Sequence, residues 1–270
     1  MRSLARLPRI ALAVVVCSFV IVLGAGRAEA VITFDSAASA SEANPLSWPH
    51  TVGTELNRLL VVGVSVNSVS PFAPVTSVTY AGQSLPRQVL NNAGSPVIEI
   101  WTLVAPPSGT ANVVVTYSLP TMLVGGSVSF AGVNQIIPIR ASNQARDIQN
   151  DALSISTSVA SQIGDVVIDA VAALGALPIC SPGAGQTSRW ALTAGAGLFG
   201  GGSTKPGEAG STSMSWDLTV DFGDVRGALA VISIMPFVPI PTLSTWALVL
   251  LAALLVAAAV LRLRRRASST

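Results

Sequence analysis

The sequence has few groups with which to do chemistry: 10% of its 270 residues are charged, and it contains one histidine and two cysteines. Outside the first thirty residues these are His50 and Cys180, because Cys17 lies in the front apolar run. His₃ and Cys₂His zinc sites are therefore excluded within one chain, and so is a disulfide inside the exported domain. We expect no metal and no cofactor, and we expect Cys180 to pack as a small hydrophobic residue.

Positive charge is also scarce in the middle of the chain. Eight arginines lie in the two end segments, whereas the stretch from Val31 to Ile240 holds seven basic and twelve acidic residues, a net charge of −5. Nucleic-acid binding requires clustered Lys and Arg side chains that displace counterions from phosphates. We therefore exclude nucleic acid as a partner of this domain.

Catalytic motifs are absent too. There is no G-x-S-x-G nucleophile elbow and no H-E-x-x-H zinc motif. Serine is abundant here because it suits turns and strands, so the presence of serines together with His50 does not support a Ser-His-Asp triad. Asp165 and Asp169 would lie on one face of a strand about 13 Å apart, too far to act as acid and base on one glycosidic bond. We expect the protein not to be an enzyme, and a polysaccharide hydrolase is the least favoured alternative.

The first thirty residues have the organisation of a secretory signal peptide. Three arginines precede the apolar run Ile10–Leu23, and Ala28 and Ala30 are the small residues of a cleavage site. Signal peptidase is expected to cut after Ala30, once the export machinery has translocated the chain, and to leave Val31 as the new N-terminus. An uncleaved N-terminal anchor is the alternative, because the apolar run is long.

The other end of the chain predicts one transmembrane helix over residues 246–263. The uncharged run from Trp246 to Leu261 rises about 24 Å as a helix, and Leu243 and Leu263 extend it toward the hydrocarbon thickness of about 30 Å. A basic cluster at residues 262–266 follows, and it consists of Arg262, Arg264, Arg265 and Arg266. Arginines stay on the cytoplasmic side, so the N-terminal domain lies outside, in agreement with the signal peptide.

A short motif precedes this helix at residues 240–246. Its residues are Ile240, Pro241, Thr242, Leu243, Ser244 and Trp246. Motif, helix and basic cluster together resemble the IPTL-CTERM sorting domain, a relative of the PEP-CTERM signals of Gram-negative bacteria. Thr245 departs from the acidic residue often found before the Trp. Pro239 and Pro241 hold the segment extended, in a form that a protease can thread.

The IPTL-CTERM resemblance implies a route for the protein. An exosortase-type transpeptidase recognises such tails in the inner membrane, and cleavage near the motif then frees the protein for the cell surface or for secretion into the extracellular matrix. A plain single-pass anchor is the alternative. The predicted organisation is therefore a signal peptide at 1–30, an extracytoplasmic domain at 31–236 and a sorting tail at 237–270.

The domain at 31–236 has the pattern of an all-β protein. Short stretches rich in Val, Ile, Thr and Ser alternate with Gly, Pro and Asn turns, and we find no amphipathic helix. Such a pattern favours a two-sheet, jelly-roll-like β-sandwich, with a parallel β-helix as the alternative. The expected strands are Val31–Phe34, Arg58–Val66, Val75–Tyr80, Pro96–Leu103, Ala111–Tyr117, Val124–Phe130, Ala152–Val159, Asp165–Ala173, Thr187–Leu192, Thr212–Leu218 and Ala228–Ile234.

Four segments of this domain carry a second resemblance. They are Asn57–Val64, Val78–Gln83, Pro106–Thr110 and Gly183–Thr187, and they are similar to segments in a family of secreted bacterial β-sandwich domains of unknown function. Because these are turn and core signatures, the resemblance implies a fold and no activity.

Several residues remain open between a functional and a structural role. Asp217, Asp221 and Asp224 are expected in a solvated hairpin loop, with a calcium site as the alternative. Glu99 is expected to face outward on its strand. The segment Gly195–Ser203 is expected to be a mobile surface loop. Trp101 and Trp216 are expected in the core, whereas Trp48 and Trp190 are left open.

These observations favour a non-catalytic cell-envelope or matrix protein. The sorting tail and the sparse chemistry suggest that the sandwich binds exopolysaccharide. A self-associating structural or adhesive surface protein is the main alternative, and it would be marked by a long unprotected edge strand.

Overall fold

The computed structural model describes residues 31–43, 45–68, 72–119, 121–147, 154–176, 179–195, 197–219, 222–238 and 245–267. The chain divides into two units. One unit spans Ala30–Val238 and contains every described strand. The described part of the other unit is a single helix, α2 (Thr245–Ala267).

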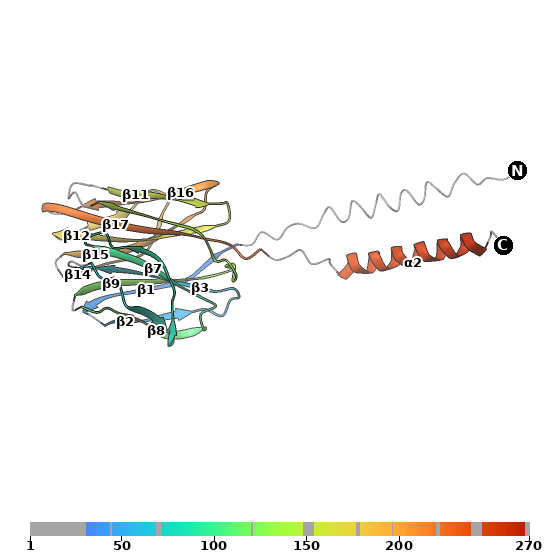
Figure 1. The fold of residues 1–270 in the computed structure, drawn as a ribbon, viewed down its shortest axis with the longest axis horizontal. Coiled ribbons are helices and arrows are strands. Elements are labelled where there is room, and N and C mark those ends of the chain that lie inside the picture. Colours follow the sequence, from blue (N-terminus) through green and yellow to red (C-terminus); the bar gives the residue numbers. More distant parts are fainter. Residues whose placement is uncertain are drawn as a thin grey trace. The chain divides into compact units, whose positions relative to one another are not determined.

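The large unit is a stack of four antiparallel sheets (Figure 1). Outer sheet 1 has the order β2 (Leu46–Val52), β8 (Gly109–Thr116), β4 (Ser77–Tyr80), β5 (Gln83–Ser84). Inner sheet 1 has the order β1 (Thr33–Ala43), β9 (Met122–Ala131), β3 (Leu59–Val66), β7 (Val97–Val104), β6 (Arg87–Asn91). Inner sheet 2 has the order β10 (Ile139–Asp147), β17 (Phe222–Ile234), β12 (Val166–Ala176), β15 (Leu198–Pro206), β14 (Thr187–Ala194). Outer sheet 2 has the order β11 (Ser154–Ser161), β16 (Gly210–Thr219), β13 (Ile179–Pro182).

Three apolar layers hold the four sheets together, one in each space between neighbouring sheets. β3 shows why inner strands are apolar throughout: Leu60 and Val62 point into the layer against outer sheet 1, and Leu59 and Val61 into the layer against inner sheet 2. All eight residues of β3 are buried. Burial of both faces makes a continuous apolar run the favoured sequence for a central strand.

The second half of the unit repeats the strands of the first, except that the two-residue strand β5 has no counterpart. The order β1-β9-β3-β7-β6 corresponds to β10-β17-β12-β15-β14, and β2-β8-β4 corresponds to β11-β16-β13. The β-bulges coincide as well, since the extra residue is Asp35 in β1 and Arg140 in β10, and Gln88 in β6 and Arg189 in β14. The unit is therefore two copies of one sandwich, which we call repeat 1 (β1–β9) and repeat 2 (β10–β17).

The repeats pack through their inner sheets with approximate two-fold symmetry. Each contact between these sheets has an equivalent in which the two repeats are interchanged. The contact of β1 with β14 corresponds to that of β10 with β6, and the contact of β9 with β14 corresponds to that of β17 with β6. Likewise, the contact of β9 with β15 corresponds to that of β17 with β7. β3 contacts its own counterpart β12, and a Cβ built on Gly63 would lie 2.8 Å from the Cβ of the equivalent Ala170. This exchange is what a two-fold axis between like units produces.

The all-β prediction is confirmed, but the predicted number of sheets was too low. A single two-sheet sandwich was expected, and the described residues form four sheets in two sandwiches. The strands at β2, β5, β6, β10, β13 and β15 were not predicted. Most of these carry Pro, Gly or polar residues that weaken the apolar alternation on which strand prediction depends.

The prediction of a mobile loop at Gly195–Ser203 is wrong, because β15 begins at Leu198 and lies inside inner sheet 2. Its glycines are buried, and large side chains occupy the space where Cβ atoms would be. A Cβ on Gly202 would lie 1.9 Å from the Trp190 ring, and one on Gly201 would lie 2.8 Å from the Trp216 ring. The glycine run is therefore a packing surface for tryptophans, which also gives Trp190 its place in the core.

Helix α2 carries most of the apolar run of the tail. Its residues from Val249 to Arg262 are solvent-exposed. Among the residues that the structure describes, no helix meets the combination of length and apolarity needed to cross a bilayer.

Candidate functional site

The residues predicted for sorting lie mostly outside the described part of the chain. Ala28 and Ala30 of the cleavage site are not described, and neither are residues 240–244 of the motif. Trp246 lies in the first turn of α2, and Arg262 and the three arginines at 264–266 lie in its last turns. The structure thus places the end of the motif and the basic cluster on one helix.

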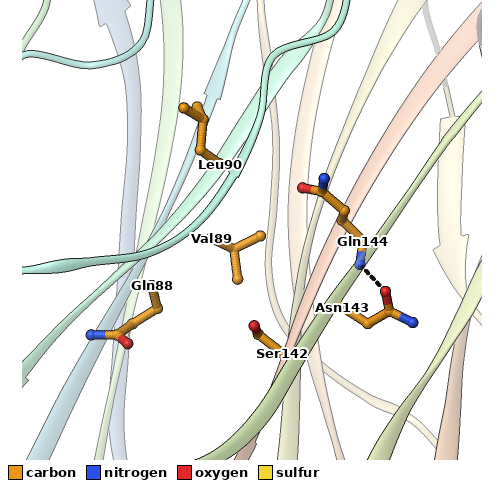
Figure 2. Close-up of a pocket in the computed structure, with 6 residues that line it drawn as sticks. All are labelled: Gln88, Val89, Leu90, Ser142, Asn143 and Gln144. Atoms are coloured by element: carbon orange, nitrogen blue, oxygen red, sulfur yellow. Dashed lines mark hydrogen bonds between the residues drawn. The ribbon is translucent and has the colours of Figure 1, made fainter.

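A polar groove of about 330 Å³ opens between β6 of repeat 1 and β10 of repeat 2 (Figure 2). Val89 and Leu90 supply its apolar surface. The remaining lining residues are neutral amides and a hydroxyl, namely Gln88, Ser142, Asn143 and Gln144. The Asn143 Oδ1 atom accepts a bond of 2.9 Å from the backbone N–H of Gln144, so that amide is held in place. A groove of this chemistry offers hydrogen bonds to an uncharged, hydroxylated ligand.

A partly buried guanidinium lies near this groove, on the same two strands. Arg146, two residues beyond Gln144 on β10, donates from Nε to Asn91 Oδ1 at 2.8 Å and from Nη2 to the Asn91 carbonyl at 2.6 Å. Its Nη1 atom is buried without a hydrogen-bond partner. Burial lowers the pKa of Arg146. Sequence reasoning missed this site, because no motif links β6 to β10.

A second polar cluster surrounds His50 at the edge between β1 and β2. His50 Nδ1 lies 2.9 Å from Ser127 Oγ, and Nε2 lies 3.2 Å from Ser36 Oγ and 3.1 Å from Ser129 Oγ. Ser129 in turn donates to Asp35 Oδ2 at 2.7 Å. Asp35 is the bulge residue of β1, and it also accepts from the Gly53 N–H.

This cluster is not a Ser-His-Asp triad. In a triad a carboxylate accepts from one imidazole nitrogen and a serine lies at the other, but both nitrogens of His50 face serines and Asp35 bonds to Ser129 instead. Ser36 donates to the Thr51 carbonyl of β2. Burial lowers the pKa of His50 to about 4 despite the opposing effect of Asp35. The cluster joins β1 to β2 with a neutral imidazole, a structural role.

Asp165 and Asp169 belong to two separate networks. Asp165 forms an ion pair with the bulge residue Arg140 at 2.5 Å. Asp169 is fully buried in repeat 2, where Trp216 Nε1 donates to Oδ2 at 2.9 Å and the N–H and Oγ of Ser203 donate to Oδ1 at 2.7 and 2.9 Å. Gln186 Nε2 lies 3.2 Å from Oδ2. Burial raises the pKa of Asp169 to about 7, with the Trp216 and Ser203 bonds opposing it.

The prediction that Glu99 faces outward is wrong. Glu99 has 0% exposure, accepts from the Val75 N–H at 2.7 Å and forms an ion pair with Arg87 at 3.3 Å. Burial raises its pKa, and the bonds from Val75 and Arg87 oppose that effect. The Glu99 carboxylate joins the chain before β4 to inner sheet 1. The sequence of β7 alone does not indicate this contact, because its partner Val75 lies in another segment.

The remaining candidates are dispersed. Asp217 is exposed on β16, Asp224 lies in β17, and Asp221 is outside the described residues. No group of three His, Cys, Asp or Glu side chains in the described part of the chain lies close enough to hold a metal ion. Cys180 packs against the apolar layer of repeat 2, as predicted. All four tryptophans of the domain are buried, namely Trp48, Trp101, Trp190 and Trp216.

His50 and Asp169 should make opposite contributions to the pH dependence of unfolding. The raised pKa of Asp169 gives stability that is complete below about 3.8 and is lost as pH rises through about 7. The lowered pKa of His50 gives stability that is complete above 6.5 and is lost as pH falls through about 4. The pKa of Glu99 is also raised, so its contribution to stability has the same pH dependence in sign as that of Asp169.

These two contributions can be separated by denaturant unfolding between pH 4 and pH 8. In Asp169→Asn, the free energy of unfolding is expected to fall more steeply with decreasing pH than in the wild type. The variant keeps the loss of stability caused by His50 and lacks the gain that Asp169 supplies as pH falls. In His50→Gln, stability is expected to rise toward acid. Identical pH profiles for all three proteins would contradict the two assignments.

Comparison with known families identifies the tail. Residues 238–266 match the IPTL-CTERM motif. No curated protein and no solved structure matches the chain. The molecule is thus an all-β double sandwich followed by a C-terminal sorting signal of the kind that marks exported proteins.

Proposed function

We propose that this protein is exported, held briefly in the inner membrane by its tail, and then released to the cell surface or the medium by an exosortase-type transpeptidase. The IPTL-CTERM match at residues 238–266 is the observation that carries the proposal. Signal peptidase acts first, after Ala30. Helix α2 then spans the membrane with the arginines at 262–266 in the cytoplasm, which is the orientation that basic residues favour.

The sequence around the motif suits this handling. Phe237 and Val238 follow the last strand and are exposed, and the sequence continues with prolines at 239 and 241, a residue type that disfavours a helix interior. Helix α2 begins at Thr245, so the residues between are the only link between domain and helix. Cleavage there would separate the β-sheet unit from the apolar segment without cutting any strand.

Substitution of Pro241 and Thr242 by alanine tests the sorting step. We expect the double variant to accumulate in the inner-membrane fraction, with surface or released protein reduced at least about tenfold, measured by fractionation and immunoblotting. Ser211→Ala/Ser213→Ala, on the exposed face of β16, is the matched control. Unchanged surface display or release of the Pro241/Thr242 variant would contradict a role of the motif in sorting.

We propose further that the double sandwich is a non-catalytic domain that binds exopolysaccharide. The support is the groove between β6 and β10, whose amides and hydroxyl suit sugar hydroxyls. The four tryptophans of the β-sheet unit are buried, so none of them offers sugars the usual aromatic stacking surface. Binding would therefore depend on hydrogen bonds within the groove.

A self-associating surface protein is the second candidate, and β11 favours it. This edge strand has eight residues with neither charge nor proline, whereas its counterpart β2 carries Pro49. Unprotected edges of this kind pair readily with another chain. Association that increases with protein concentration, and that a lysine at Ser156 prevents, would distinguish this function from polysaccharide binding.

A further inference from the structure

The most exposed large apolar side chains of the β-sheet unit come from five segments that meet at one end of it. These segments are the residues before β1, the loops before β3, between β9 and β10 and between β11 and β12, and the residues after β17. Apolar residues exposed singly are ordinary on a protein surface, whereas a contiguous group marks an interaction site. The side chains in the described part of the unit that are exposed by 60% or more are Val31, Leu56, Ile136, Ile137, Ile163 and Val238.

Gly132, the first residue of the loop between β9 and β10, joins three of the other segments to that loop. Its N–H donates to the Leu56 carbonyl at 3.1 Å, and its carbonyl accepts from the Phe237 N–H at 2.7 Å. The residues before β1 lie alongside, since a Cβ built on Gly132 would be 2.3 Å from the Val31 carbonyl oxygen. Four of the five segments are therefore in direct contact.

The three isoleucines are fixed beside this junction. The Asn134 Oδ1 atom accepts from the N–H groups of both isoleucines of the β9–β10 loop, at 2.9 and 3.0 Å, and so holds them in a tight turn. Ile163 lies in the turn between β11 and β12, where a Cβ on the neighbouring Gly164 would lie 3.8 Å from Pro236 Cγ, just after β17. The six exposed side chains thus belong to one surface, which we call the apolar end.

The charged side chains beside the apolar end neutralise one another. Arg140 forms an ion pair with Asp165, and Lys205 forms one with Glu208. The domain as a whole is negatively charged, so electrostatic attraction would not hold it on an anionic surface. The apolar end therefore suits a partner that buries apolar side chains.

The chain leaves the apolar end toward the sorting tail. Val238 is followed, seven residues later, by Thr245, the first residue of α2. Seven residues reach at most about 25 Å when fully extended. If α2 spans the membrane as proposed above, this is the largest possible distance from Val238 to the point where the helix enters the bilayer. A tether this short raises the effective concentration of lipid around the apolar end, so a contact too weak to form by itself can persist.

We propose that the apolar end docks on the bilayer surface while the tail holds the protein, with its side chains inserted among the lipid headgroups and the adjoining acyl chains. The inference rests on the membrane hold proposed above and adds a second contact with the membrane. Burial of apolar area drives the docking. Docking keeps the motif at residues 240–246 close to the membrane, where the transpeptidase acts. Cleavage then removes the tether and leaves a contact too weak to retain the domain.

Quenching of an introduced tryptophan by brominated lipid measures this contact. The full-length protein is reconstituted into vesicles of phosphatidylcholine brominated in its acyl chains, as Ile136→Trp and, for the matched control, as Leu119→Trp. Leu119 is also exposed but lies at the opposite end of the unit, because it precedes Met122, from which β9 runs to Ala131 next to the apolar end. The five native tryptophans are common to both proteins. We expect the added indole to be quenched at least about fivefold more at position 136 than at position 119.

Charges placed on the apolar end should abolish this difference. Ile137→Asp/Ile163→Asp, introduced into the Ile136→Trp protein, changes two side chains that are 60% and 83% exposed, so the fold is expected to be kept. Quenching at position 136 should then fall to that at position 119. Thr116→Asp/Ser118→Asp, at two exposed positions near Leu119, is the control in the same background and should leave quenching unchanged.

Flotation of the vesicles separates this inference from the membrane hold. Protein that floats with the vesicles but shows equal quenching at positions 136 and 119 would overturn docking and leave the membrane hold intact. A fluorescence shift at position 136 that depends on protein concentration, with no quenching by lipid, would assign the apolar end to a second copy of the chain and also overturn docking. Protein that does not float would overturn the membrane hold and this inference with it.

Discussion

Replacement of Asp169 by valine is expected to lower the free energy of unfolding by about 3 kcal/mol at pH 6, although valine occupies the equivalent position, Val62, in repeat 1. Valine suits the strand, but it removes the acceptor for Trp216 Nε1 and for the Ser203 N–H and hydroxyl. A buried donor left without an acceptor costs about 1–3 kcal/mol. The loss therefore comes from the unpaired donors and not from strand propensity. Urea unfolding measures it directly.

A double-mutant cycle separates this effect from simple repacking. In the Asp169→Val background, Trp216→Phe removes one of the unpaired donors, so its cost should be smaller there than in the wild type. Asp217→Val, at an exposed neighbour of Trp216, is the control and should change stability by less than about 0.5 kcal/mol. A loss of similar size at Asp217, or strict additivity of Asp169 and Trp216, would show that the network contributes little.

Replacement of Gly126 by valine should be at least as damaging, with a loss of about 3 kcal/mol or more. Gly126 and Gly125 are neighbours on β9 and face opposite sides of inner sheet 1. A Cβ at Gly126 would lie 2.2 Å from the Trp190 ring, and one at Gly125 would lie 2.4 Å from the Trp48 ring. Neither indole has room to move, because each is buried between two sheets. The Gly126→Val protein should therefore show a lowered unfolding midpoint or fail to accumulate.

Removal of the obstructing ring provides the counter-test. Gly126→Val combined with Trp190→Ala should be more stable than the sum of the two single losses predicts, because the new side chain then occupies part of the space of the indole. Ala191→Val, at the exposed neighbour of Trp190, is the matched control and should be nearly neutral. A nearly neutral Gly126→Val would contradict the packing described for Trp190.

The sequence predicted the central strands well because their chemistry is local. Leu59–Val64 is apolar on both faces, and Thr212–Leu218 alternates, so burial follows directly from the pattern. The duplication was not predicted, because equivalent positions carry unlike residues: Val62 corresponds to Asp169, and Val89 corresponds to Trp190. Each large residue is accommodated by a small partner on another strand, so the shape of the core is kept while similarity between the repeats is lost.

The sorting tail and the groove differ in how far the sequence alone predicts them. The sorting tail is readable from sequence because motif, apolar run and basic cluster are contiguous. The groove depends on two strands about fifty residues apart and on a tryptophan that is missing from one of two equivalent positions, so no local pattern marks it. Glu99 and Asp169 escaped prediction as buried carboxylates because their partners are distant in sequence: Val75 lies in the chain before β4, and Trp216 lies on β16.

The C-terminus of the protein recovered from the cell surface or medium tests the central claim most directly. Intact-mass spectrometry of that material should give a chain that begins at Val31 and ends near residues 238–245, without helix α2. A surface-exposed chain that retains α2 and continues to Thr270 would contradict processing of the tail and would make the helix a permanent anchor.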